Sequence, residues 1–428
     1  MSGMLFRLLP AIAATALAVS AHAGDALADG DLPNNFPFLN QAGFAGTYST
    51  AGVVDLDNAF HVPQGTNGRS CESCHLPHAG WSVRPLDVEF QFLLSGGTDP
   101  IFNLLDANSP TANVATPQAR YAAYSMLRKG LFRRGGDVPA NAEYEIVAID
   151  DPLGTGGSLT RFQAFRRPLA TANFHIAKNV GWHDQNTNGS GNVHAGLVTQ
   201  ATGAIRGAEQ GQPPTPDTVE SIAVYEEGLA FAQQYVFGVG LLTSCGGRGG
   251  PEHLSAQLPV DAPFDLYDAW RNLAPGSCTT RSADRKRAQI ARGQDVFNAV
   301  KNGKTCRGCH NAANNGSNID GRLFDVGASR PEFRKPGMPL YTLHKRGSED
   351  PKDIRQTTDP GRALVSGRWG DIDRFKTPSL RGLAARAPYF HNGIAATLED
   401  VVIHYEVALG FSFTEQERSD LVAFLEAL

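Results

Sequence analysis

Two pentapeptides of identical spacing, CESCH at 71–75 and CRGCH at 306–310, constrain this 428-residue chain more than any other feature. The C-x-x-C-H pattern is the attachment signature of c-type haem. The two thiols form thioether bonds with the porphyrin vinyl groups, and the adjacent imidazole reaches the iron from one side. The sequence therefore predicts two covalently bound c-type haems, attached through Cys71, Cys74, Cys306 and Cys309 and ligated by His75 and His310.

Other uses of paired cysteines fit the two motifs less well. A thioredoxin-like redox centre would follow a strand in a βαβ pattern, and neither motif does. A zinc site would need further ligands at suitable spacing, and a disulfide within each pair is a third possibility. The other two cysteines, Cys245 and Cys278, lie in loop-like segments. In an oxidising compartment we expect them to form one disulfide, with two free thiols as the alternative.

The first residues have the character of a secretory signal peptide. A single basic residue, Arg7, precedes an apolar run over residues 8–19, and Ala21-His22-Ala23 provides the small residues of a cleavage site. The apolar run is too short to span a bilayer. We therefore expect cleavage after Ala23 and a periplasmic mature chain without an integral membrane segment; an uncleaved, membrane-tethered form is the alternative.

The composition excludes two classes of partner. The formal net charge is −5, and acidic and basic residues are mixed along the chain. No basic patch of the kind that binds nucleic acid or an anionic membrane is present in the sequence. The 46 glycines and 26 prolines predict long irregular loops between short helices.

Helical periodicity supports a haem domain around each motif. Apolar residues at near-helical spacing precede the second motif, at Ile290, Ala291, Val296, Phe297 and Val300. A capping box, Thr414-x-x-Glu417, opens a helix that reaches the end of the chain. Nearer the first motif, helical patterns cover residues 118–131 and 218–235, and the best strand signal spans residues 144–149.

These patterns predict a mainly α fold. It would consist of two class-I-cytochrome-c-like helical haem domains packed face to face, with long loops and little β-structure. Residues 24–244 would form the first domain, with an inserted segment around 84–160. Residues 245–284 would form a disulfide-closed linker, and residues 285–428 the second domain.

Three segments resemble a known family. The block FKTPSLRGLAARAPYFHNGIAATLEDVVIHYE (375–406) resembles the C-terminal haem domain of bacterial di-haem cytochrome c peroxidases and of MauG-type enzymes. The segment RRPLATANFHIAKNVGWHDQ (166–185) resembles the region between the two haems of those families. The segment VTQATGAIRGAEQ (198–210) is similar to the element on the distal side of their first haem. The segments 84–160 and 240–285 lie outside this resemblance.

The resemblance implies roles for individual residues near the first haem. Trp182 corresponds to the aromatic bridge between the haems, and Gln200 and Glu209 correspond to the residues above the first haem. Gln210 stands at the family's glutamate position, one residue after Glu209, so the identity of the distal acid stays open.

Other matched positions concern the region between and around the haems. Arg167 stands where the family places an Asn that binds calcium, and a calcium ion beside that guanidinium would be repelled. Calcium is therefore possible but doubtful, and Arg167 is a candidate replacement. His391 is expected to orient a propionate or the surroundings of the second haem.

The sixth ligand of the second haem is the most informative matched position. Counting fourteen residues from His391, as the family spacing requires, gives Tyr405, where the peroxidases have Met and MauG-type enzymes have Tyr. Phenolate stabilises ferric and higher oxidation states, whereas thioether raises the reduction potential. Neighbouring helical residues point about 100° apart, so only one of His404 and Tyr405 can face the iron. Met338 could ligate the iron instead, or the sixth position could be open.

The resemblance implies an oxidoreductase that reduces hydrogen peroxide at the first haem. Oxidising equivalents would pass through Trp182 to a Tyr405-ligated second haem and then oxidise a protein or small-molecule donor, as in MauG-type enzymes. One alternative is a cytochrome c peroxidase supplied by a small cytochrome or copper protein. Another is a di-haem electron-transfer protein without enzymatic activity.

Overall fold

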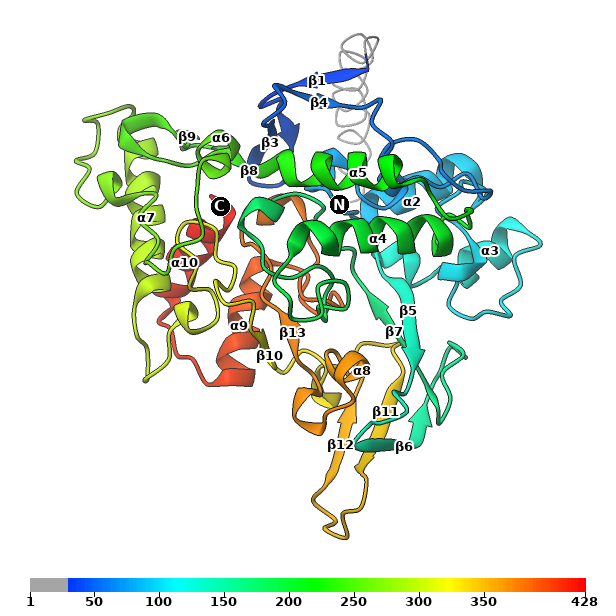
Figure 1. Ribbon diagram of the computed structural model, residues 1–428. Helices are drawn as coiled ribbons and strands as arrows, with labels where there is room; N and C mark the ends of the chain where they lie inside the picture. Colours follow the sequence, from blue (N-terminus) through cyan, green and yellow to red (C-terminus); the bar gives the residue numbers. More distant parts are fainter. Residues whose placement is uncertain (1–29) are drawn as a thin grey trace, which may run out of the picture.

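The computed structural model describes residues 30–428 (Figure 1). The expected signal peptide, residues 1–23, lies outside the described residues. Residues 30–428 contain nine α-helices, α2 to α10, and thirteen short strands, β1 to β13. The fold is therefore helical with several small antiparallel sheets, and the expectation of little β-structure is wrong.

The helices fall into two groups along the chain. In the first half lie α2 (Pro85–Ser95), α3 (Pro117–Ala123), α4 (Val193–Gly207) and α5 (Pro216–Gly228). In the second half lie α6 (Pro251–Ser255), α7 (Arg281–Asn298), α8 (Ala363–Ser366), α9 (Leu398–Leu409) and α10 (Glu415–Glu426). Helices α7, α9 and α10 gather on one side of the molecule, and α4 and α5 cross its centre (Figure 1).

The strands pair into five small sheets. A four-stranded sheet has the order β2 (Phe38–Leu39), β3 (Gly43–Ser49), β8 (Leu229–Val236) and β9 (Gly240–Leu241). Three two-stranded pairs are β1 (Asp31–Pro33) with β4 (Val53–Asp55), β5 (Phe132–Asp137) with β7 (Arg161–Arg166), and β10 (Leu323–Phe324) with β13 (Phe375–Lys376).

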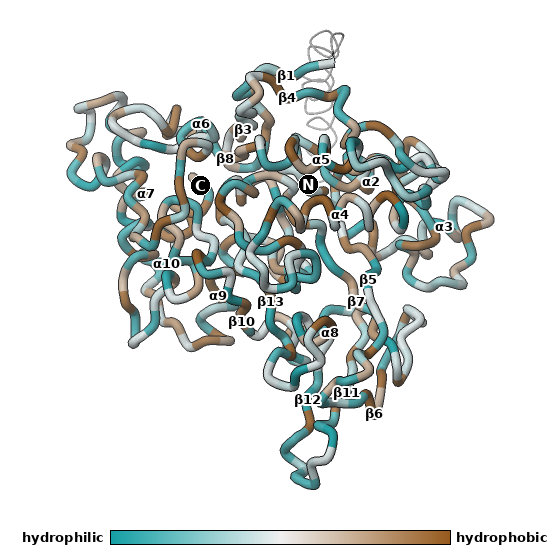
Figure 2. The backbone as a smooth tube through the Cα atoms, in the orientation of Figure 1, coloured by the Kyte–Doolittle hydropathy of each residue, from teal (hydrophilic) through white to brown (hydrophobic). Residues whose placement is uncertain are grey.

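The fifth sheet joins the two halves of the chain. Its order is β12 (Ile354–Thr357), β11 (Leu340–Lys345) and β6 (Tyr144–Asp150), all antiparallel. Strand β6 is the strand expected at 144–149, and its partner β11 lies about 200 residues later. The loop between β11 and β12 projects from the body of the molecule and is hydrophilic along most of its length (Figure 2).

One expected helix changes to a strand halfway. The pattern at 218–235 predicts a single helix, but α5 ends at Gly228 and β8 begins at Leu229. Strand β8 pairs along its length with β3, which comes from the start of the described chain. Pairing with a strand so distant in sequence overrides the local helical pattern.

Two helices enclose the second C-x-x-C-H motif, as expected. Helix α7 leads into the motif and packs on α10, whose capping box at Thr414 and Glu417 is present. Gly293 permits the close contact, because a Cβ atom there would lie 1.9 Å from the carbonyl oxygen of Asp420. Val300 lies beyond the end of α7 and is exposed.

The apolar cores lie beside the two motifs. Cys306 packs against a large buried cluster built from α7, α9, α10 and the 264–270 segment. Cys71 and Cys74 pack against two different clusters, one around Trp81, Ala201 and Ile222 and one around Val88, Phe92 and Leu127.

Within residues 30–428, no helix has both the length and the apolar character needed to cross a bilayer. The structure also contains a disulfide between Cys245 and Cys278.

Candidate haem sites

The second motif opens into a cavity. Residues 306–308 form a single 3₁₀ turn that carries Cys306 and Cys309 at its two ends. Both cysteines and His310 line a cavity of about 680 Å³ between α7, α9, α10 and the 375–391 segment. This volume is typical of a cofactor site.

Each motif histidine is oriented by a backbone carbonyl. The Nδ1–H of His310 donates to the oxygen of Gly316 at 2.5 Å, and the Nδ1–H of His75 donates to the oxygen of Trp81 at 3.0 Å. Burial lowers the pKa of both rings to about 4, so both are neutral at pH 7. This tautomer leaves the Nε2 lone pair available, as a metal-ligating histidine requires.

The charges around the cavity suit an apolar group with anionic substituents. Its lining is mostly apolar but includes four cationic side chains, Arg167, Lys304, Lys376 and Arg386. Within residues 30–428, no Asp or Glu lines it. Burial lowers the pKa of Lys376 to about 8, and a bound anion would offset that cost. These residues therefore fit a c-type haem, whose porphyrin is apolar and whose propionates are anionic.

The structure separates the three candidates for the sixth ligand. Tyr405, on α9, lines the cavity together with His310, and burial raises the pKa of its hydroxyl, with the thiols of Cys309 and Cys306 close by. His404 lies outside the cavity, buried between Phe333 and Phe390.

The Nε2–H of His404 donates to the carbonyl oxygen of Val326 at 2.8 Å, which occupies that ring nitrogen. Met338 lies in a separate buried cluster with Met126 and Phe165, also outside the cavity. Of the three side chains, the structure places only Tyr405 among the residues that line the cavity with His310.

Trp182 and His391 lie together in the lining of the same cavity. Both line it, and their ring centroids are 6.1 Å apart in an edge-to-face arrangement. The indole N–H of Trp182 donates to the carbonyl oxygen of Arg167 at 2.7 Å. His391 stacks on Phe375 at 3.8 Å between ring centroids. Leu169 also lines the cavity, and its backbone lies against His75 of the first motif.

Glu209 lies beside the first motif. Its side chain is buried, its Oε2 accepts the backbone N–H of Gln64 at 2.9 Å, and the Cys71 thiol donates to its Oε1 at 3.7 Å. Burial raises the pKa of the Glu209 carboxyl. Joining Cys71 to a porphyrin removes the thiol proton, which leaves Oε1 as the atom free to exchange a proton.

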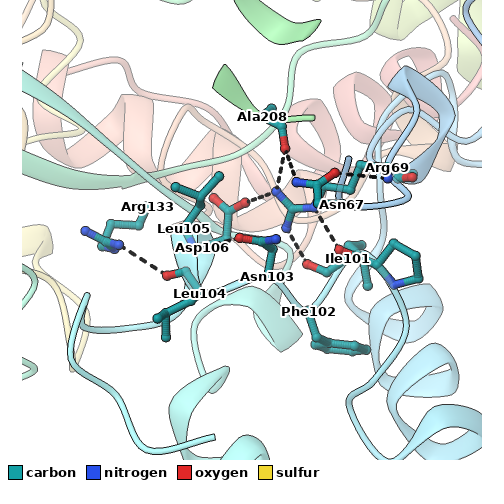
Figure 3. A network of polar contacts seen from close by, with 12 residues as sticks. Asn67, Arg69, Ile101, Phe102, Asn103, Leu104, Leu105, Asp106, Arg133 and Ala208 are labelled. Atoms are coloured by element: carbon teal, nitrogen blue, oxygen red, sulfur yellow. Dashed lines mark hydrogen bonds and ion pairs between the residues drawn. The ribbon is translucent and has the colours of Figure 1, made fainter. Parts of the chain in front are cut away.

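A buried arginine just before the first motif, Arg69, is bonded to Ala208, the residue before Glu209 (Figure 3). The Arg69 guanidinium donates to Asp106 Oδ2 at 2.8 Å, to the Ile101 carbonyl at 2.6 Å and to the Ala208 carbonyl at 3.5 Å. The Asn67 amide donates to the same Ala208 carbonyl at 2.9 Å. Residues just before Cys71 thus hold the residue just before Glu209. No local sequence pattern indicates this network, because its partners are far apart in the chain.

Asp106→Asn should destabilise the protein strongly. It leaves the fully buried Arg69 without a counter-charge, and breaking a buried ion pair from one side costs about 3–5 kcal/mol. Arg134 also pairs with Asp106 and would lose that partner. The free energy of unfolding, measured by urea titration, should fall accordingly.

The matched control is Asp137→Asn, which removes the same charge from an exposed pair with Arg161. The free energy of unfolding of Asp137→Asn should fall by less than about 1 kcal/mol. Equal losses in the two variants would show that the Arg69 network does not stabilise the fold.

Two further residues are Gln200, which the resemblance places above the first haem, and Glu226, for which the sequence gives no expectation. Gln200 is half-buried on α4, and within residues 30–428 no hydrogen bond links it to Cys71 or Glu209. Glu226, on α5, carries no sequence signal of a role at the site. It is fully buried, its Oε2 has no hydrogen-bond partner in the described chain, and its charge acts on Cys71. Burial raises the pKa of Glu226 well above the usual range of a carboxyl.

The chain has recognisable relatives among characterised proteins. No protein-family profile matches it. It is 36% identical over 187 residues to the cytochrome-c peroxidase IdrP2 of Denitromonas iodatirespirans, a match that covers 41% of this chain and 46% of that protein. It is 46% identical over 65 residues to the methylamine utilization protein MauG of Methylorubrum extorquens, covering 13% and 18% of the two chains.

Among solved structures, a MauG-like protein associated with microbial copper homeostasis matches with a TM-score of 0.34 and 18% identity, over 64% of this chain and 75% of that one. The chain spans less than half the length of the curated relatives it matches. Over those matched segments it is similar in sequence to bacterial cytochrome-c peroxidases and to MauG.

Proposed function

We propose that this chain is a di-haem c-type peroxidase that reduces hydrogen peroxide and oxidises a protein or small-molecule donor. The two haem units would pack face to face in the periplasm, with one haem at each C-x-x-C-H motif. The observation that carries the proposal is the difference between the two sites. A buried carboxylate, Glu209, lies beside the first motif, and a half-buried phenol, Tyr405, lines the cavity of the second.

A haem held by His75 or His310 would supply the iron that binds and cleaves peroxide and a porphyrin that stores oxidising equivalents. The work of the surrounding chain is to move protons and to hold the sites in place. Glu209 Oε2 is fixed as an acceptor by the N–H of Gln64, so Oε1 takes the proton from the nearer peroxide oxygen and delivers it to the farther one. Water then becomes the leaving group.

The second site is suited to retaining an oxidising equivalent. Tyr405 provides a hard anionic oxygen donor when deprotonated, and such a ligand favours the higher oxidation states of iron. Burial raises the pKa of its hydroxyl, so deprotonation depends on a cation nearby, which the iron would provide. The relatives' cytochrome-c peroxidase reaction would need a protein electron donor instead, and no described residue identifies one.

Trp182 is the proposed route between the sites. Trp182 lines the cavity beside the second motif, and its indole N–H donates to the backbone carbonyl of Arg167. Two residues further along the chain, the backbone of Leu169 lies against His75. An indole can hold an electron vacancy, which suits Trp182 to this role.

The test is peroxide consumption by the holoprotein with a one-electron dye as donor. We expect each peroxide to be reduced to two waters with two dye molecules oxidised. Replacing Cys71 and Cys74 by alanine should abolish turnover, because the first haem is lost. A holoprotein that carries both haems but consumes no peroxide would instead be the electron-transfer protein.

A further inference from the structure

A single buried arginine, Arg167, occupies the junction between the two candidate sites. Its side chain is almost fully buried. Its guanidinium donates to the carbonyl oxygens of Arg386 at 3.0 Å, Ala387 at 3.4 Å and Gly130 at 3.4 Å. Gly130 lies in the first half of the chain and the other two in the second half, so one side chain joins both.

The hydrogen-bond partners of this guanidinium are carbonyl oxygens. Within residues 30–428, Arg167 forms no ion pair with a carboxylate; Asp87 acts on its charge only weakly, and its stronger charged neighbour is another cation, Arg386. Burial and that neighbour lower the pKa of Arg167 to about 10, which still leaves it charged at neutral pH. Backbone carbonyl oxygens that converge on one cation are also among the ligands of calcium sites.

The guanidinium fills this position too closely for a calcium ion to share it. A Cβ atom on Gly130 would lie 2.3 Å from Arg167 Nη1, so the glycine is what lets the side chain approach. Calcium requires six to eight oxygen ligands at about 2.3–2.6 Å. Here the carbonyl lone pairs already accept from Arg167, and a divalent cation would be repelled. The residues present therefore do not fit calcium.

The backbone of Arg167 also forms hydrogen bonds with two residues that line the cavity beside the second motif. Its N–H donates to the carbonyl oxygen of His391 at 2.6 Å, and its carbonyl oxygen accepts the Trp182 indole at 2.7 Å. Arg386, whose carbonyl the side chain binds, lines the same cavity. One residue thus fixes Trp182, His391 and the 386–387 turn relative to one another.

We propose that Arg167 is a positioning residue whose guanidinium replaces the structural calcium ion between the two sites, making the protein calcium-independent. The placement of Trp182 and His391 then depends on a covalent part of the chain and not on a dissociable ion. This inference rests on the proposed function only in expecting a haem in the cavity. Because Arg167 lines that cavity, its charge also disfavours the more positive, oxidised state of an iron bound there and raises its reduction potential.

The test compares the wild-type holoprotein with Arg167→Asn, each in a chelator and in excess CaCl2. The wild-type protein should have the same melting temperature and the same reduction potentials in chelator and in excess CaCl2. In chelator, Arg167→Asn should melt lower by at least about 5 °C, because buried carbonyls lose their donors. The reduction potential of the second haem should fall as well. Added calcium should restore both values in the variant, because Asn offers an oxygen ligand beside the vacated carbonyls.

The matched control is Arg206→Asn, which removes an exposed arginine and should change neither measurement. Arg167→Lys keeps the charge with fewer donors, and it should retain the wild-type potential while melting lower. If Arg167→Asn does not accumulate, the inference is still tested by the calcium response of the wild type and by the reduction potential of Arg167→Lys.

Two outcomes would overturn the inference. One is a wild-type protein that loses stability or changes its potential on chelation and recovers with calcium. The other is an Arg167→Lys potential that falls far below the wild-type value. Neither readout uses peroxide, so a failure here is distinguishable from a failure of the proposed peroxidase activity.

Discussion

Tyr405→Met should raise the reduction potential of the haem in the second cavity by a few tenths of a volt. Tyr405 lines the cavity that contains His310, and exchange of an axial phenolate for a thioether stabilises ferrous iron. Axial ligands move haem potentials over a range of about 0.8 V. Spectroelectrochemical titration of the holoprotein measures the change directly.

The control for this exchange is His404→Gln on the same helix. His404 is buried between two phenylalanine rings outside the cavity, and its ring N–H is used by the Val326 carbonyl. Its replacement should leave the potential within experimental error of the wild type. A large shift in His404→Gln with none in Tyr405→Met would assign the ligand to the neighbouring residue.

Glu209→Gln should lower the rate of peroxide reduction by about 100- to 10,000-fold, the usual contribution of a positioned acid–base group. The amide retains the shape of the side chain and can still accept the Gln64 N–H, but it cannot take a proton from peroxide. Stopped-flow measurement of the first peroxide reaction isolates this step. Haem content should be unchanged, since Glu209 is not an attachment residue.

The pH dependence of this step has a defined sign. Glu209 must be deprotonated to act as a base, so the wild-type rate should rise as pH increases through its pKa. Burial raises that pKa, so the rise should lie above the range of an exposed carboxyl. The rise should disappear in Glu209→Gln.

Two more variants distinguish Glu209 from other acids. Glu220→Gln changes an exposed residue and should have the wild-type rate. Glu226→Gln tests the second buried acid near Cys71, whose pKa burial also raises. A full loss of rate in Glu226→Gln with none in Glu209→Gln would transfer the acid–base role to Glu226.

Features that are encoded locally are the ones that the sequence predicts best. The C-x-x-C-H turns, the helices α7 and α10 and the strand β6 all follow from patterns within a few residues of each other. The capping box at Thr414 fixes the start of α10, and a helical angle of about 100° separates His404 from Tyr405. The helical spacing shows that only one of His404 and Tyr405 can face the iron. Only the packing of α9 shows which of the two side chains lines the cavity.

Features that depend on distant segments cannot be predicted in the same way. The local pattern at 229–235 is helical, yet these residues form β8, because β3 supplies the backbone partners. Arg69 and Asp106 are paired by a loop within the segment that the family resemblance leaves unexplained. Glu226 has no motif of its own, and only the packing of α5 makes it a buried neighbour of Cys71.

The two motifs should hold covalent haems of different coordination, the first open to peroxide and the second ligated by Tyr405. The electron paramagnetic resonance spectrum of the oxidised holoprotein, recorded beside that of Tyr405→Met, tests this most directly. We expect one high-spin and one low-spin ferric signal, with only the low-spin signal changed in the variant. Two low-spin signals, a spectrum identical in both proteins, or a purified chain without covalent haem would contradict it.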